Sequence, residues 1–360
     1  MAATRHPEVR SRASLERSVI EEFDSTNQLD AVLGLPHQLT HALVRVDRAE
    51  LTPIAAPGGV IVAGMGGSAA GARLAVAALG QRLTAPLVVS DGYRLPGWAG
   101  PNTLVFASSY SGNTEETLAA YDEAAERGAP RIAATTGGGL AERAGADGVP
   151  VIALPTGFQP RATIGYALVA ALEAAAIAGA APSVRHDIIA AAVLAADLVE
   201  EWGPESPDDS LAKSIARAVH GTIPVFAGAE LAGAAAYRWK CQFNENAALP
   251  AFASILPEAD HNEVVGWDAA RALGRFSYVS LEDPRAHERN ALRAELTADI
   301  ARAGADPVLR VPARGHSAME RLVSLVLLGD LVSLYAAVLR EADPVDIPAI
   351  DGLKAALAAR

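Results

Sequence analysis

Cysteine is almost absent from this chain of 360 residues. Cys241 is the only one, so no disulfide can form within the chain. No group of cysteine and histidine residues has the spacing of a zinc site, and we expect no metal and no other cofactor. A chain without disulfides is typical of a reducing compartment, so we expect a cytoplasmic protein.

Positive charge is also scarce. The chain has 30 Lys and Arg against 42 Asp and Glu, which gives a formal net charge of −12, and the basic residues form no block. Such a chain is a poor partner for nucleic acid or anionic membranes, and we expect neither. Any phosphate group must then be bound by local backbone N–H groups and hydroxyls, because no positive field attracts it.

Long apolar runs are missing too. Residues 1–10 are polar and lack the apolar region of a signal peptide. Later apolar runs are interrupted by Gly, Pro or charge before they reach the length of a membrane span. The chain is nevertheless 51% hydrophobic and longer than one typical domain, so we predict a soluble protein of two domains.

Short apolar runs alternate with helical patterns along the first half. Residues 14–50 have apolar positions at helical spacing. Strands are predicted at 60–63, 87–90, 103–107, 131–135 and 151–154, with helices over 69–79, 114–127 and 162–178. Continuous apolar strands that alternate with helices indicate an α/β fold, in which a mainly parallel sheet is covered on both faces.

The pattern then repeats. Strands predicted at 223–228, 276–280 and 307–311 resemble those at 60–63, 104–107 and 151–154, and helices over 231–243 and 318–339 resemble those over 69–79 and 162–178. This indicates two similar αβα sandwich domains related by internal duplication. We predict a helical lead-in over 1–45, a first domain over 46–185, a second over 186–342, and a tail helix over 343–360.

Two serine-rich turns occur only in the first half. Gly64-Met65-Gly66-Gly67-Ser68 and Ser109-Tyr110-Ser111-Gly112-Asn113-Thr114 each end a strand and open a helix. A helix N-terminus offers unpaired N–H groups and a positive dipole end, which suit an anion. We therefore predict that the first domain binds a phosphorylated small molecule. The predicted ligands are Gly66, Gly67, Ser68, Ser109, Ser111 and Thr114.

The first turn has an alternative interpretation. Gly64, Gly66 and Ala69 also fit the G-x-G-x-x-A pattern of dinucleotide-binding proteins, with Asp91 at the end of a later strand. The hydroxyl of Ser68 and the second serine-rich turn do not belong to that pattern. Ordinary structural turns with Ser/Thr helix caps are the other alternative.

Two polar motifs lie in the second half. Glu245 stands between two asparagines at the end of an apolar helix, where a carboxylate is costly unless it has partners. His261 lies between Asp260 and Asn262. A carboxylate base and an imidazole that titrates near neutral pH suit proton transfer beside a carbonyl. An exposed helix-end glutamate and a surface histidine are the alternatives.

Together these motifs resemble a known family. The serine-rich turns look like those of the sugar isomerase (SIS) domain. The further segments 159–162, 237–247, 256–267 and 353–354 resemble the bifunctional phosphoglucose/phosphomannose isomerases of the phosphoglucose isomerase superfamily, over roughly residues 15–357. The resemblance implies two flavodoxin-like SIS domains. It also implies interconversion of glucose 6-phosphate, and of mannose 6-phosphate, with fructose 6-phosphate.

The resemblance implies residue roles as well. Glu245 would move a proton between C1 and C2 through a cis-enediol(ate), and Arg161 would stabilise the enediolate. His261 would open the sugar ring and would come from the neighbouring subunit of a homodimer, with Lys354 reaching the ring beside it. Read without the resemblance, Arg161 is a surface or anion-binding arginine and Lys354 a lysine of a tail helix. The chain departs from the family pattern at Thr163, Ala248 and Asp260.

Two other functions remain open at this point. A non-catalytic sugar-phosphate sensor is one, because SIS domains also occur in regulators. The chain has no helix-turn-helix or basic segment, and it keeps Glu245, His261 and Arg161, which favours the enzyme. A nicotinamide-dependent dehydrogenase is the other, and it predicts dinucleotide binding.

Overall fold

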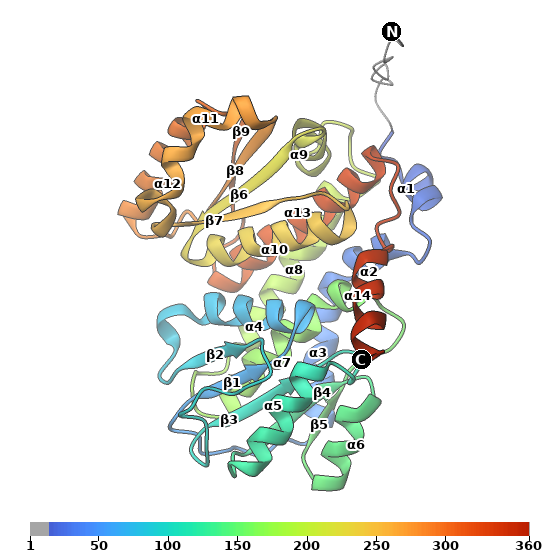
Figure 1. The fold of residues 1–360 in the computed structure, drawn as a ribbon, viewed down its shortest axis with the longest axis vertical. Coiled ribbons are helices and arrows are strands. Elements are labelled where there is room, and N and C mark those ends of the chain that lie inside the picture. Colours follow the sequence, from blue (N-terminus) through green and yellow to red (C-terminus); the bar gives the residue numbers. More distant parts are fainter. Residues whose placement is uncertain (1–13, 360) are drawn as a thin grey trace.

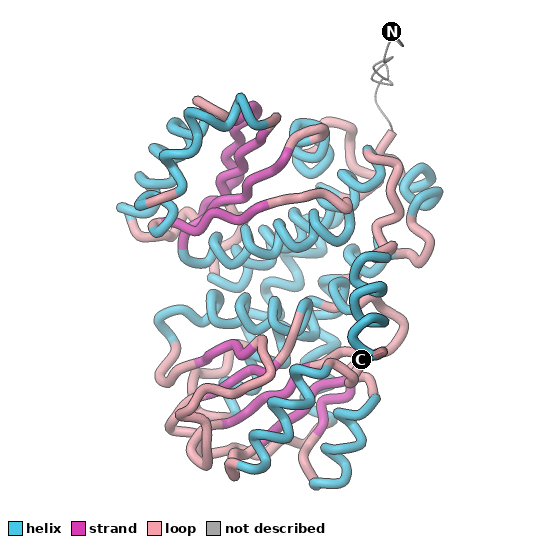
Figure 2. Tube along the Cα trace, viewed as in Figure 1, coloured by secondary structure: helices cyan, strands magenta, loops and turns pink. Residues whose placement is uncertain are grey.

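Two parallel β-sheets lie at opposite ends of the molecule, with helices between them (Figures 1 and 2). This computed structural model describes residues 14–359, so the first part of the predicted lead-in lies outside the described residues. The strands of the first sheet are β1 (Val60–Ala63), β2 (Leu87–Ser90), β3 (Leu104–Ser108), β4 (Arg131–Thr135) and β5 (Val151–Ala153). Those of the second are β6 (Ile223–Ala229), β7 (Phe252–Leu256), β8 (Phe276–Glu282) and β9 (Ala305–Pro312).

The two sheets share one strand order. The first runs β2-β1-β3-β4-β5 and the second β7-β6-β8-β9, with every neighbouring pair parallel. The predicted α/β fold with mainly parallel sheets is therefore confirmed. In the second sheet β9 is the fourth strand, the position that β4 occupies in the first sheet. The sequence pattern matches this strand to 151–154, which is β5. Descent of the two halves from one duplicated domain stays a prediction.

Helices cover both sheets. The first half contains α1 (Arg17–Phe23), α2 (Gln28–Leu33), α3 (Leu35–Arg48), α4 (Gly66–Leu79), α5 (Glu115–Glu126), α6 (Gly138–Asp147) and α7 (Ile164–Ile177). The second contains α8 (Arg185–Trp202), α9 (Leu211–Val219), α10 (Glu230–Asn246), α11 (Trp267–Leu273), α12 (Glu288–Ala301), α13 (Ala318–Leu339) and α14 (Pro348–Ala358). Four 3₁₀ turns are η1 (Gly80–Arg82), η2 (Pro160–Ala162), η3 (Glu258–His261) and η4 (Glu263–Gly266).

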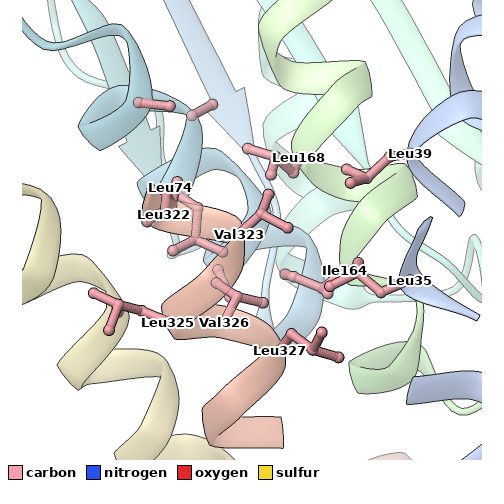
Figure 3. Packing of buried hydrophobic residues seen from close by; sticks show 14 of the residues in the cluster. Leu35, Leu39, Leu74, Ile164, Leu168, Leu322, Val323, Leu325, Val326 and Leu327 are labelled. Atoms are coloured by element: carbon pink, nitrogen blue, oxygen red, sulfur yellow. The ribbon is translucent and has the colours of Figure 1, made fainter. Parts of the chain in front are cut away.

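The main core lies between the sheets, around α13. Figure 3 shows Leu322 and Val323 of α13 near Leu74 of α4 and Leu168 of α7, all within one buried cluster. Ser317 starts α13 with a capping box, in which its hydroxyl accepts from the Glu320 N–H and the Glu320 carboxylate accepts from the Ser317 N–H. Because Leu322 and Val323 of α13 lie in the same buried cluster as residues of α4 and α7, the two halves of the chain share one core.

Helix α13 is apolar almost all round. Among the described residues it is the one helix long and apolar enough to cross a membrane, and 94% of its most apolar window is buried inside the protein. A helix that is hydrophobic on every face belongs either in a membrane or in the centre of a large core. Its burial here makes α13 the central core helix.

The segment between the sheets is helical. Helix α8 begins at Arg185 and packs against α3 of the first half and α13 of the second. The boundary predicted between residues 185 and 186 therefore falls at the start of a packed helix. The boundaries predicted at 46, 186 and 343 stay predictions, while α4 and α10 form a direct contact between the halves.

Candidate active site

The two serine-rich turns meet at the point where the strand order of the first sheet reverses. β1 and β3 are parallel neighbours, with Ala63 beside Ala107, and their chain connections leave in opposite directions. In an open parallel sheet, ligands bind outside the carboxyl ends of the strands at such a switch point. The turns are therefore placed where a ligand site is expected.

The first turn has an open helix N-terminus. Gly66 begins α4 with a φ of +51°, and no side chain caps the helix. A Cβ on Gly64 would lie 2.8 Å from the Ser108 carbonyl oxygen, so the first turn contacts the end of β3 closely. Ser68, in the first turn of α4, makes no side-chain hydrogen bond within residues 14–359. Its N–H donates to the Met65 carbonyl oxygen, whereas its hydroxyl and the N–H groups of Gly66 and Gly67 have no partner among the described residues.

The second turn holds itself together through hydroxyls. Ser109 Oγ lies 2.9 Å from Thr114 Oγ1, and the Gly112 N–H donates to Ser109 Oγ at 3.1 Å. Ser109 is buried, whereas Ser111 is exposed and accepts only from the Asn113 N–H. Ser109 and Thr114 therefore shape the turn, and Ser111 is the hydroxyl that reaches outward.

Arg161 connects the first turn with the second half of the chain. It lies in η2, whose Pro160 carbonyl oxygen would be 2.7 Å from a Cβ on Gly67. Its side chain is 3% exposed, and its Nη1 lies 3.6 Å from Glu245 Oε2. Burial lowers the pKa of Arg161, and the charge of Glu245 opposes that shift. The first serine-rich turn, the arginine and the glutamate are thus linked by direct contacts.

Most of the Arg161 guanidinium is already bound by the protein. Nε donates to Asn246 Oδ1 at 2.7 Å, and Nη2 donates to the carbonyl oxygens of Pro344 at 2.6 Å and Val345 at 3.2 Å. These partners come from the end of α10 and from the segment before α14. Nη1 is the nitrogen that faces Glu245, and it makes no hydrogen bond within residues 14–359.

Glu245 lies in the last turn of α10, and its side chain is 28% exposed. The two flanking amides point elsewhere, since Asn244 Nδ2 donates to the Leu249 carbonyl and Asn246 is fully buried. The helix extends three residues beyond the predicted end at Phe243, which places Glu245 on a rigid element. No role is predicted from the sequence for either asparagine. In the structure the buried Asn246 accepts a hydrogen bond from Arg161 Nε and so holds its guanidinium group.

His261 does not lie beside Glu245 within one chain. β6 and β7 are parallel and α10 connects them, so α10 starts at the carboxyl edge of the second sheet and ends at the amino edge. His261 follows the carboxyl end of β7, on the far side of a helix about 25 Å long. It is exposed, and the neighbouring Asp260 carboxylate accepts from Arg293 and Thr297 of α12.

Lys354 is also apart from Arg161 and Glu245. It lies on α14, whose residues are exposed and which stands on the outside of the molecule (Figure 1). Within the described residues, its amine makes no hydrogen bond or ion pair. The helix begins just after Pro344 and Val345, the residues that accept from Arg161. The segment that leads into α14 thus contacts Arg161, whereas Lys354 itself does not.

Comparison with known proteins gives the family of this fold. Residues 208–357 match the model of the bacterial phospho-glucose isomerase C-terminal SIS domain. The bifunctional phosphoglucose/phosphomannose isomerase of Caldicellulosiruptor bescii is 40% identical over 83% of this chain and 89% of its own length. Those of Aquifex aeolicus and Thermoplasma acidophilum are 35% and 34% identical, over 85% and 82% of this chain and 91% and 88% of their own.

Solved structures resemble the chain in fold. A hypothetical protein of Thermus thermophilus superposes with a TM-score of 0.73 at 17% identity, covering 96% of this chain and 93% of its own. A glucose-6-phosphate isomerase like protein of the same organism gives a TM-score of 0.60 at 19% identity, covering 95% and 99%. At these identities the likeness describes the fold alone.

Proposed function

We propose a function from one premise: this chain belongs to the bifunctional phosphoglucose/phosphomannose isomerase family. It is an isomerase that interconverts glucose 6-phosphate and mannose 6-phosphate with fructose 6-phosphate. One structural observation supports this function most strongly. The serine-rich turn at Gly67 lies against η2, and Arg161 of η2 lies against Glu245.

The first half binds the phosphate group. Ser68 and Ser111 donate their hydroxyl protons to phosphate oxygens, together with the N–H groups of Gly66 and Gly67. Ser109 and Thr114 hold the second turn in shape through their mutual hydrogen bond. This arrangement suits an acidic chain, because hydrogen-bond donors at helix N-termini bind an anion without a surrounding positive field.

The second half carries out the proton transfer. Glu245 removes the proton from C2 of the open-chain aldose, which gives a cis-enediolate, and returns it to C1. A second proton passes from the C2 hydroxyl to the C1 oxygen, so the aldehyde at C1 becomes an alcohol and C2 becomes the ketone. Nη1 of Arg161 stabilises the negative charge on the enediolate oxygens, which is the type of electrostatic contribution that lowers such barriers most. Only protons and electron pairs within the sugar move, so the reaction needs no cofactor.

Ring opening requires a second copy of the chain. We infer a homodimer in which His261 of one copy serves the site of the other, since the two residues lie at opposite edges of the second sheet in one chain. An exposed apolar stripe on α12 runs beside Arg293 and Thr297, which hold the His261 segment. Its residues are Leu292, Leu296 and Ile300, which are 41%, 52% and 46% exposed. Lys354 on the exposed α14 reaches the sugar ring beside that histidine.

A mixing experiment tests the shared site. Glu245→Gln and His261→Ala are each inactive in this scheme, but a heterodimer of the two has one intact site. Co-expression should recover up to about one quarter of the wild-type turnover, because half of randomly paired dimers are mixed and each has one good site. No recovery, with dimers present, would place His261 and Glu245 in the same chain's site.

The function itself is tested with a panel of substrates. Fructose 6-phosphate formation from glucose 6-phosphate and from mannose 6-phosphate should be seen in a coupled assay, and in D₂O the product should carry deuterium at C1. Binding of these sugars without turnover of either would instead indicate the sensor. Saturable binding of a nicotinamide dinucleotide would favour the dehydrogenase. Finding the native protein in the cytoplasmic fraction would fit this metabolic role.

A further inference from the structure

A stripe of polar side chains runs through the otherwise apolar contact between α10 and α13. On α10 it consists of positions four apart, and on α13 of positions three apart, so each set lies on one helix face. The α10 members are Arg238, Gln242 and Asn246, and the α13 members are Asp330 and Ser333. All five side chains are buried, with residue exposures between 0% and 3%.

The stripe is joined by hydrogen bonds between the two helices. Arg238 Nη2 donates to Asp330 Oδ2 at 2.6 Å. Eight residues further along α10, Asn246 Nδ2 donates to Ser333 Oγ at 2.9 Å. Ser333 Oγ in turn donates to the Asp330 carbonyl oxygen at 2.7 Å, which closes the connection on α13.

Stability does not explain this stripe. A buried ion pair can often be replaced by apolar residues without loss, because desolvation offsets the attraction between the charges. Three buried polar atoms also make no hydrogen bond within the described structure, namely Arg238 Nε, Gln242 Nε2 and Asp330 Oδ1. Leucine and methionine would fill this contact at lower cost.

Both ends of the stripe reach Arg161. Arg238 Nη2 donates to the Arg161 carbonyl oxygen at 3.1 Å, so it holds the backbone of η2. Asn246 Oδ1 accepts from Arg161 Nε at 2.7 Å, so it holds the guanidinium. Because α4 and η2 belong to the first half and α10 and α13 to the second, the stripe fixes Arg161 across the boundary between the halves.

We propose that Arg238, Asp330, Asn246 and Ser333 are positioning residues that hold Arg161 Nη1 against Glu245 during the isomerisation. This inference rests on the proposed function, in which Nη1 stabilises the enediolate. The four residues touch no reacting atom, and the phosphate turns lie outside the stripe. Loss of the stripe should therefore slow the chemical step more than it weakens sugar-phosphate binding, which η2 can affect only through its contact with Gly67.

The test removes both charges of the pair together. The double variant Arg238→Met/Asp330→Leu leaves no buried unpaired charge, so it should fold with an unchanged or higher Tm. We expect kcat to fall about 100-fold, since a misplacement near 1 Å has that effect, with a smaller rise in KM because η2 also contacts Gly67. A crystal structure of the variant should show η2 displaced, with the 3.6 Å approach of Nη1 to Glu245 lost.

A second buried ion pair, between α13 and the residue after β8, is the matched control. Arg321 Nε donates to Asp283 Oδ1 at 2.6 Å, and the other hydrogen bonds of the two side chains are to Arg285 and His316, not to η2. Arg321→Met/Asp283→Leu should keep the wild-type kcat. Ser333→Ala is a milder variant that removes one buried hydroxyl, and it should lower kcat about tenfold at constant KM.

Each outcome decides one question. A folded Arg238→Met/Asp330→Leu enzyme with wild-type kcat and an unmoved η2 would overturn the inference. An equal loss of kcat in Arg321→Met/Asp283→Leu would overturn it as well. If Arg238→Met/Asp330→Leu does not fold, a Ser333→Ala enzyme with wild-type kcat would overturn the inference. A wild-type protein without turnover would overturn the proposed function instead, and the position of η2 in the variant would still decide whether the stripe holds Arg161.

Discussion

The two sheets have the same strand order but differ in what fills the switch point. In the first sheet, α4 starts at Gly66 with a φ of +51°, and its N-terminus is open. In the second, α10 starts at Glu230 with a φ of +52°, and the Glu230 carboxylate accepts from Asn290 Nδ2 at 2.7 Å and from the His287 N–H at 3.3 Å. The same backbone turn thus carries glycine in one sheet and an acid in the other.

The end of the next strand shows the same difference. β3 is followed by the serine-rich turn, whereas β8 is followed by Asp283, which accepts from Arg321. The second sheet has carboxylates of its own at the positions where the first has the serine-rich turns. Carboxylates repel an anion, so in the proposed function the second half contributes through the other end of α10, where Glu245 lies.

The largest effect is expected from the base at that far end of α10. Glu245→Gln should reduce kcat by about 10²–10⁴-fold, because the amide cannot accept the C2 proton, while fructose 6-phosphate still binds. Steady-state kinetics and calorimetric titration measure the two quantities. Glu230→Gln, at the start of the same helix, is the control. A Glu245→Gln enzyme of normal kcat would show that Glu245 is not the base.

The next largest effect concerns the arginine between the halves. Arg161→Lys keeps a positive charge but cannot reproduce the planar set of bonds to Asn246, Pro344 and Glu245. We expect kcat to fall about 100-fold with little change in KM. As a control, Arg310→Lys at an exposed position on β9 should leave kcat and KM unchanged. A change confined to KM would mean that Arg161 binds the phosphate group.

A smaller effect is expected at the phosphate turn. Ser68→Ala removes one donor to the phosphate, which should weaken binding of fructose 6-phosphate about tenfold, as for a hydrogen bond to a charged group. The kcat at saturating sugar should stay close to normal. Ser280→Ala on β8 is the matched change in the second sheet and should leave binding unchanged. Equal losses in both variants would contradict the division between the sheets.

The smallest effect is expected at Glu230, whose carboxylate already has hydrogen-bond partners in the second half. Glu230→Gln removes a carboxylate from the first turn of α10, which should lower the free energy of unfolding by about 0.5 kcal/mol. Neither kcat nor KM should change. Urea unfolding measures the first quantity and the coupled assay the second. A rise in KM would show that this switch point also takes part in substrate binding.

The sheets could be predicted because their strands are short, continuous apolar runs. The predicted strands at 60–63, 87–90 and 131–135 have the bounds found in the structure. No element is predicted at β7, in which Phe252 and Ile255 are 55% and 41% exposed. Ser254 interrupts this strand and its exposed residues alternate with buried ones, so β7 lacks the continuous apolar run on which the other predictions depend.

The candidate site could be predicted in part for a different reason. The serine-rich turns and Glu245 stand in local motifs, and each motif can be recognised from a few consecutive residues. Arg238 and Asp330 are 92 positions apart and look like surface charges, so only the packing of α10 on α13 shows them as partners. The separation of His261 from Glu245 likewise follows from the parallel pairing of β6 and β7, which cannot be recognised from either segment alone.

The most direct test is a crystal structure of the Glu245→Gln protein with fructose 6-phosphate bound. The account predicts the phosphate group at the N-termini of α4 and α5, in contact with Ser68 and Ser111. C1 and C2 should lie between residue 245 and Arg161 Nη1. A phosphate group bound at the second sheet, or a sugar whose C1 and C2 lie away from residue 245, would contradict it.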